Sequence, residues 1–192
     1  MKGRGGELPR GRGRRGARAG AGPGSASPGA ARLRLRQGRP AAMPTLRNLI
    51  LEERMNPLFL QAERFIVGVE DAGAGEGQLL GGGQIRAIGP PDGGAGEVAS
   101  VVVRAGSRGQ GIGGRILDEL LRRNTDGFSS LFVLTTGDRR SVDFYRRRGF
   151  EVVDTASVPA AMRVEQALGS LVARLARGES CVAMRLGRLP AD

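Results

Sequence analysis

The sequence predicts one domain of mixed α/β class over residues 31–192, preceded by a leader, residues 1–30. Three observations support this prediction. The chain has 192 residues, of which 40% are hydrophobic, so it is long enough to bury one core of ordinary size. From residue 31 onward, segments with the period-two alternation of strands are interspersed with segments whose apolar residues recur at helical spacing. The leader, in contrast, consists mainly of Gly, Arg, Ala and Pro and offers almost nothing to bury.

The leader is expected to be disordered, because it cannot offset the entropy of ordering. Its Arg-rich, acid-poor composition fits an organellar transit peptide, although serines are few. One alternative is a dispensable tail. Another is an RNA-binding Gly/Arg segment, although the leader has no aromatic residues for stacking. The sequence contains no secretory signal and no apolar stretch of membrane-spanning length. We therefore expect an intracellular protein, in a plastid or mitochondrion if the leader is a transit peptide and in the cytoplasm otherwise.

Composition excludes several classes of site. The chain has no His and one Cys, Cys181, which rules out histidine triads, multi-Cys zinc sites and internal disulfides, and no metal is expected. The net charge of +11 would ordinarily indicate a polyanionic partner, but seven of the basic residues lie in the leader. Because the domain itself is only mildly basic, we do not expect nucleic acid as a partner.

The domain is predicted to start with a strand and a helix. Leucines alternate with arginines over residues 32–36, which is the period of a half-buried strand. Pro44 suits a helix N-terminus, and Leu46 and Leu49 lie on one face of the helix that follows, which ends before Pro57. A short second helix is expected after it.

A hairpin and a further strand come next. Residues 65–69 and 79–88 are predicted to pair around a turn, despite three consecutive glycines at 81–83. Residues 97–103 are strongly apolar and β-branched towards their end, which predicts another strand.

The second half alternates helices with strands. After a glycine-rich loop, apolar residues at helical spacing predict a helix over 112–121, and a buried strand is expected at 130–136. Asp138 is a candidate N-cap for a helix running to Arg148, with Gly149 after its C-terminus. The remaining predicted elements are a strand at 150–153, a late helix over 164–175 and a final strand at 181–186.

The loop before the helix at 112–121 carries four glycines, Gly109, Gly111, Gly113 and Gly114. Glycines let the backbone approach a ligand closely, and a helix N-terminus offers unpaired amides with a partial positive charge, so the loop is interpreted as a phosphate cradle. A dinucleotide-binding fold would need the strand to run almost into the first glycine and an acidic residue at the end of the next strand. Here the strand ends earlier, at Val103, and the next strand ends in Thr135-Thr136. No lysine follows the glycines, which excludes a Walker loop, and a purely structural turn is the alternative.

Two motifs resemble those of the GNAT N-acetyltransferase superfamily. The first is Arg108-x-x-Gly111-x-Gly113 after a β-branched strand, and the second is the segment 143–150, a helix that carries Tyr145 and ends in Gly-Phe. The order of predicted elements over residues 31–154 is also similar to that family, so the resemblance covers about residues 31–186. The leader and C-terminal part look similar to plant plastid members. The resemblance implies a central, mostly antiparallel sheet that splays between its fourth and fifth strands and is flanked by helices.

The resemblance also implies acetyl-CoA as the co-substrate. The amides of the glycine loop would bind its pyrophosphate, with Arg108 organising the loop, and the strand before the loop would pair with the pantetheine arm. Many family members have Asn seven residues before the helix tyrosine; here Asp138 stands there and lacks the amide donor, which favours its capping role. The positions implied to contact the cofactor are Val101, Val102, Val103, Arg108, Gly109, Gln110, Gly111, Ile112, Gly113, Gly114 and Asp138.

Two residues are candidates for the chemistry. An alkylamine is protonated at pH 7, and removing its proton costs about 4.6 kcal/mol, so a general base is useful. Glu97 stands where histone-type family members place their catalytic glutamate, with a solvated glutamate at the strand start as the alternative. Tyr145 corresponds to the family tyrosine that protonates the departing thiolate or hydrogen-bonds its sulfur, with a core aromatic as the alternative. Cys181 is interpreted as a buried small apolar residue.

These observations predict an enzyme, an acetyltransferase that moves the acetyl group of acetyl-CoA to a primary amine by direct attack. The acceptor, a protein lysine, an N-terminus, a polyamine or a small metabolite, is expected to be selected by loops such as 54–63 and 154–163. Two alternative functions are not catalytic. The first is a module that binds acyl-CoA without turnover, and the second is nucleic-acid binding through the leader. The oligomeric state is not assigned.

Overall fold

The fold is described from a computed structural model. The structure describes residues 33–73, 77–89, 94–124, 127–164, 167 and 180–187. The predictions for the leader, and for most of the late helix over 164–175, lie outside these residues.

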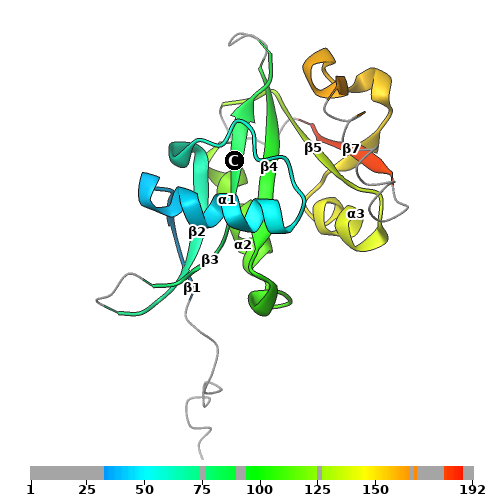
Figure 1. The fold of residues 1–192 in the computed structure, drawn as a ribbon. Helices are drawn as coiled ribbons and strands as arrows, with labels where there is room; N and C mark the ends of the chain where they lie inside the picture. Colours follow the sequence, from blue (N-terminus) through cyan, green and yellow to red (C-terminus); the bar gives the residue numbers. More distant parts are fainter. Residues whose placement is uncertain are drawn as a thin grey trace, which may run out of the picture. The chain divides into compact units, whose positions relative to one another are not determined.

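The described residues form a seven-stranded sheet in the order β1-β2-β3-β4-β5-β7-β6 (Figure 1). All neighbouring strands are antiparallel except β4 and β5, which are parallel. This is the mixed, mostly antiparallel sheet that was predicted. The strands are β1 (Leu33–Gln37), β2 (Phe65–Glu70), β3 (Leu79–Ala87), β4 (Ala95–Val103), β5 (Ser130–Thr136), β6 (Glu151–Val153) and β7 (Cys181–Leu186).

The strands β4 and β5 pair only at their beginnings and then diverge. Their ladder starts at Ala95↔Ser130 and ends at Glu97↔Phe132, whereas β4 continues to Val103. A bulge in β4 accompanies the separation: Ser100 has a φ of +56°, and the register with β3 shifts next to it. The expected splay between the fourth and fifth strands is therefore present (Figure 1).

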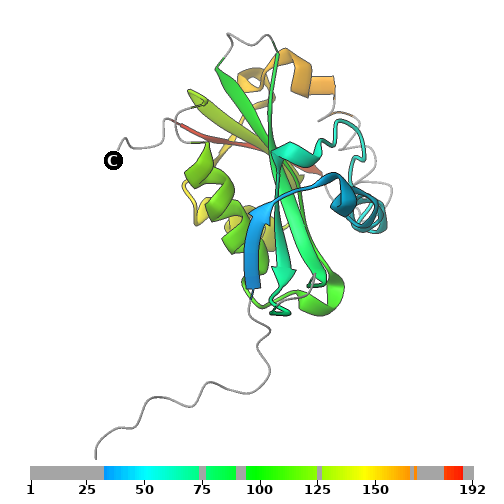
Figure 2. The same ribbon diagram turned by 90° about the vertical axis from the view of Figure 1, so that its left-hand side faces the viewer.

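Helices cover both faces of the sheet, because side chains of a strand alternate between its faces. Phe65 and Val67 of β2 pack against α1 (Met43–Glu52), whereas Ile66 between them packs on the side of α2 (Ile112–Arg123). Figure 2 shows α1 and α2 on opposite sides of the sheet. A third helix, α3 (Arg139–Arg146), contributes Tyr145 to the cluster on the α2 side.

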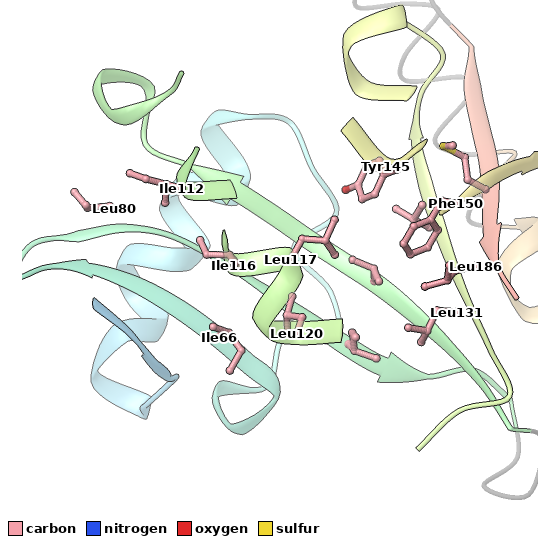
Figure 3. Close-up of a cluster of buried hydrophobic side chains, with 14 residues drawn as sticks. Ile66, Leu80, Ile112, Ile116, Leu117, Leu120, Leu131, Tyr145, Phe150 and Leu186 are labelled. Carbon is pink, nitrogen blue, oxygen red and sulfur yellow. The ribbon is translucent and has the colours of Figure 1, made fainter. Parts of the chain in front are cut away.

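Two of the consecutive glycines in β3 explain how both helices approach the sheet closely. A Cβ on Gly82 would lie 2.7 Å from Leu46 of α1, and one on Gly83 would lie 3.1 Å from Leu120 of α2. The glycines that weaken the strand pattern in the sequence are thus packing positions. The larger core lies under α2 and joins it to Tyr145, Phe150 and Leu186 (Figure 3).

Two predicted elements differ in detail. The short second helix is reduced to a 3₁₀ turn, Ala62–Arg64, in a connection where Phe59 takes a positive φ that a helix does not allow. The helix predicted to reach Arg148 ends at Arg146. Gly149 then takes a φ of +83° and turns the chain so that Phe150 is buried.

Candidate functional site

The glycine loop ends in an uncapped helix N-terminus. Gly111 is the N-cap of α2 with a φ of +76°, and no side chain caps this end of the helix. The amides of Ile112, Gly113 and Gly114 are the first in the helix and have no partner within it. Because residues 108–111 are exposed, these amides and the positive end of the helix face an accessible surface that suits an anion.

The glycines of the loop have two different roles. Gly109 and Gly111 both have left-handed φ angles, +79° and +76°, and a Cβ at either position would meet nothing within 4 Å, so it would project into the open space in front of the loop. A Cβ on Gly114, in contrast, would lie 2.5 Å from Nη2 of Arg148, and one on Gly113 would lie 3.3 Å from Val103. The first two therefore leave the space in front of the helix N-terminus open, and the last two let α2 pack against its neighbours.

Arg108 ties the loop to two other elements. Its Nε donates a hydrogen bond of 3.1 Å to the carbonyl oxygen of Val103, and its Nη2 pairs with the carboxylate of Glu53 just after α1. Glu53 was not singled out in the sequence, because the contact joins residues 55 positions apart. Arg108 thus holds the loop in place.

The edge of β4 beyond the ladder is open towards β5. Val101, Val102 and Val103 follow the last paired residue, so on this side their backbone has no partner strand in the part of the chain that the structure describes. An extended ligand can add to such an edge as a strand would. The carbonyl of Val103 already accepts a hydrogen bond from Arg108. The backbone groups of Val101 and Val102 are therefore more available to such a ligand.

Tyr145 lies at the opening between the two diverging strands. Its ring is 8% exposed and makes edge contacts with Phe144 and Phe150, whose ring centroids lie 4.9 Å and 5.7 Å away. Its hydroxyl points away from Phe150 and towards the side of β4 (Figure 3). Burial raises the pKa of Tyr145, while the charge of Arg148 opposes this shift. The phenol therefore stays protonated well above neutral pH.

Glu97 is buried in β4 and paired with an arginine of the neighbouring strand. It is 5% exposed, so the alternative of a solvated glutamate is wrong. Its Oε2 accepts a hydrogen bond of 2.6 Å from Nε of Arg86 and forms an ion pair with Nη2 of the same residue at 2.5 Å. Arg86 is its cross-strand partner in β3. The sequence analysis missed Arg86, because that pairing depends on the register between two strands.

Glu97 of β4 and Tyr145 of α3 both lie near the point where β4 and β5 diverge. Glu97 is the last residue of β4 that pairs with β5, and its charge adds to the burial that raises the pKa of Tyr145 and of Cys181. The Cys181 thiol is therefore kept in its protonated form, which is a poor nucleophile. A carboxylate and a phenol are thus the titratable groups available for proton transfer here.

Asp138 caps α3, as its position in the sequence predicts. Its Oδ1 accepts a hydrogen bond of 2.9 Å from the amide of Ser141, and its Oδ2 accepts one of 2.5 Å from the hydroxyl of Thr136. Burial disfavours its charge, but the hydrogen bonds from Ser141 and Thr136 outweigh burial and lower the pKa of Asp138. One carboxylate oxygen is therefore committed to the start of α3 and the other to the end of β5.

We expect Asp138→Ala to lower the free energy of unfolding by about 1 kcal/mol at pH 7, because the cap is lost. A carboxyl with a lowered pKa stabilises the fold above its unfolded pKa of about 4, and that contribution disappears as the pH falls through the folded value. Asp138→Asn keeps a good cap and should retain most of the stability at pH 7 while losing this acid dependence. Urea denaturation between pH 3 and 7 measures both; equal stability of the alanine variant and the wild type would contradict the capping role.

A cleft of about 290 Å³ lies beside Arg86, the cross-strand partner of Glu97. It is formed where the connection after α1 and the segment after β6 meet the end of β3, and these segments belong to the two loops expected to select the acceptor. Its lining residues are Phe59, Arg86, Ala87, Ile88, Gly89, Ala161 and Met162.

Within the described ranges, no group of three or more His, Cys, Asp or Glu is arranged to hold a metal ion. In that same part of the chain, none of the helices has the length and apolar character needed to cross a bilayer.

Comparison with known proteins gives a family match and several similar folds. The model of the acetyltransferase (GNAT) family matches residues 33–150. Rv2747 from Mycobacterium tuberculosis, solved with CoA, is 23% identical with a TM-score of 0.62, over 81% of this chain and 99% of that one. The CoA-bound N-acetylglutamate synthase of Neisseria gonorrhoeae is 20% identical with a TM-score of 0.61, over 84% of this chain but only 36% of its own. A Kribbella flavida GCN5-related N-acetyltransferase is 18% identical with a TM-score of 0.59, over 81% of this chain and 97% of its own. At these identities the structural neighbours show a shared fold.

Proposed function

The chain belongs to the acetyltransferase (GNAT) family, and on that basis we propose that it transfers an acetyl group from acetyl-CoA to a primary amine by direct attack. The observation that carries the proposal is the adjacency of three features. The uncapped N-terminus of α2 follows an open edge of β4, and that edge begins at Glu97, where β4 and β5 separate beside Tyr145. This arrangement provides places for a phosphate, an extended arm and a reacting group in the order in which acetyl-CoA carries them.

The residues that would hold acetyl-CoA follow from that arrangement. The amides of residues 109–114 would bind the pyrophosphate, and the backbone of Val101 and Val102 would pair with the pantetheine arm. Acetyl-CoA supplies an activated acetyl thioester when bound. Transfer forms a carbon–nitrogen bond, breaks the carbon–sulfur bond, and releases one proton from the amine and one thiolate.

Glu97 is the group best placed to take the proton from the amine. It is a carboxylate held at the point of divergence by a hydrogen bond and an ion pair with Arg86. Neutralising an alkylammonium at pH 7 costs about 4.6 kcal/mol, which a positioned base offsets in part. Glu97 would act directly or through a water molecule.

Tyr145 would assist the leaving thiolate as a hydrogen-bond donor. A phenol ordinarily has a pKa of about 10 and a thiol one of about 8.5, so complete proton transfer already costs about 2 kcal/mol. Burial raises the pKa of Tyr145 further, which makes complete transfer less favourable still. A hydrogen bond to the developing thiolate requires no transfer and is strong in a site that excludes water.

The proposal is tested with the full chain by measuring acetyl-CoA binding by calorimetry and thiol release in the presence of a panel of primary amines. Saturable binding together with amine-dependent thiol release, and acetylated amine in the mass spectrum, would support it. Binding without turnover of any amine would favour the non-catalytic acyl-CoA-binding module. No binding by the folded protein would overturn the proposal.

We expect Glu97→Gln to lower kcat by about 10²-fold or more, the range of general acid–base catalysis, with the Kd for acetyl-CoA nearly unchanged. The single variant also leaves the buried charge of Arg86 without its carboxylate, which by itself destabilises a fold. The double variant Arg86→Gln, Glu97→Gln removes both charges and is the control. If it recovers the melting temperature but not kcat, Glu97 acts in the chemistry; recovery of both would show a structural role only.

A further inference from the structure

The cleft beside Arg86 has features that bear on which amine this protein accepts. It lies on the sheet face towards which Arg86 and Glu97 project as cross-strand partners, so its floor is next to the carboxylate assigned to the amine proton. Its walls come from Phe59, Ile88 and Met162, which are apolar. Its volume of about 290 Å³ is close to the lower end of the ~300–1,000 Å³ of small-molecule pockets, so it fits one small group.

Phe59 is held at the rim of this cleft in an unusual state. Its φ is +59°, a left-handed conformation that is an outlier for a bulky residue, and its side chain is 59% exposed. Its ring lies over the guanidinium of Arg86, with 4.9 Å between the ring centroid and Cζ. Strain and an exposed aromatic surface both cost free energy, and such features concentrate at sites of ligand contact.

The charge around the cleft disfavours a polycation. Arg86 is the charged residue of the described lining, and it is engaged by the carboxylate of Glu97. A polyamine or a lysine-rich segment carries further ammonium groups, and none of the described lining residues offers them a carboxylate. An amine with an uncharged apolar substituent needs no such partner and buries that substituent against the walls.

On the basis of the proposed function, we propose that this cleft receives amines that carry a small apolar group next to the reacting nitrogen, and that Phe59 is the residue that selects for that group. The amine nitrogen then lies towards Glu97, and the apolar group lies against Phe59, Ile88 and Met162. Acceptors of this class include the amino termini of peptides that begin with an aliphatic residue and amides of aliphatic amino acids.

The test compares three acceptors with the full chain at saturating acetyl-CoA: leucinamide, glycinamide and spermidine. Leucinamide and glycinamide share the reacting amine and differ in the isobutyl group. The ratio of their kcat/KM values therefore measures what contact between that group and the cleft contributes. We expect leucinamide to exceed glycinamide by at least about tenfold, the discrimination typical of an apolar pocket, and spermidine to be the poorest of the three. A ratio near one, or a preference for spermidine, would overturn the inference.

Phe59→Ala should reduce the leucinamide to glycinamide ratio of kcat/KM towards one, because the apolar group loses its contact with the ring. The matched control is Leu58→Ala, which removes a neighbouring side chain that is 61% exposed and does not line the cleft, and which should keep the wild-type ratio. Equal ratios in the two variants would remove Phe59 from acceptor selection. If acetyl-CoA binds but none of the three amines is turned over, the inference is overturned, and the wider amine panel then decides the proposed function separately.

Discussion

Replacing Gly111 with valine should weaken acetyl-CoA binding by at least about tenfold while the protein remains folded. Gly111 has a φ of +76°, and a left-handed conformation costs an L-residue about 1–2 kcal/mol, more for a β-branched one. A Cβ there would meet nothing within 4 Å, so no core contact is lost. Valine would instead shift the loop and place a side chain in front of the amides that would bind the pyrophosphate.

The matched control for this variant is Gly106→Val in the same loop. Gly106 lies in the 3₁₀ turn Ala105–Ser107, has no positive φ, and has nothing within 4 Å of an added Cβ. Calorimetry with acetyl-CoA should give a wild-type Kd for this control and weak or undetectable binding for Gly111→Val, with both variants cooperative in thermal unfolding. Wild-type affinity in folded Gly111→Val would show that the loop is a structural turn and not a cradle.

The elements that the sequence predicts well are those set by local rules. Asp138 is the cap of α3 because a side-chain oxygen can reach an amide three residues on, and this needs no knowledge of the rest of the fold. The strand Cys181–Leu186 and the helix after the glycine loop follow from periodicity in the same way. The position of the glycine loop before a helix N-terminus could be predicted because the two are adjacent in the chain.

The features that could not be predicted depend on contacts between distant segments. The pairing of Arg86 with Glu97 requires the register of β3 against β4, which the bulge at Ser100 shifts without any signal in the apolar run around it. The cleft brings Phe59 next to Met162, about a hundred positions along the chain. A sequence pattern shows that loops exist at both places, but the closeness of the loops follows only from the folded sheet.

Tyr145→Phe should lower kcat by about 10²-fold and leave the Kd for acetyl-CoA and the melting temperature close to wild type. The variant keeps the ring and its edge contacts with Phe144 and Phe150 and removes only the hydroxyl that would stabilise the leaving thiolate. Loss of one preorganised donor to a developing negative charge typically costs about 10²–10³ in rate. Steady-state thiol release and calorimetry measure the two quantities on the same preparation.

The buried phenol also sets an expectation for the pH dependence of the wild type, and a serine variant separates the donor role from a packing role. Because burial raises the pKa of Tyr145, the hydroxyl keeps its proton beyond pH 10, and kcat should show no decline from ionisation of the phenol at its ordinary value. The control is Ser130→Ala, which removes a hydroxyl from the first residue of β5 and should retain wild-type turnover. If Tyr145→Phe turns over as fast as this control, the tyrosine is a core aromatic, and the thiolate must leave with help from another group or from solvent.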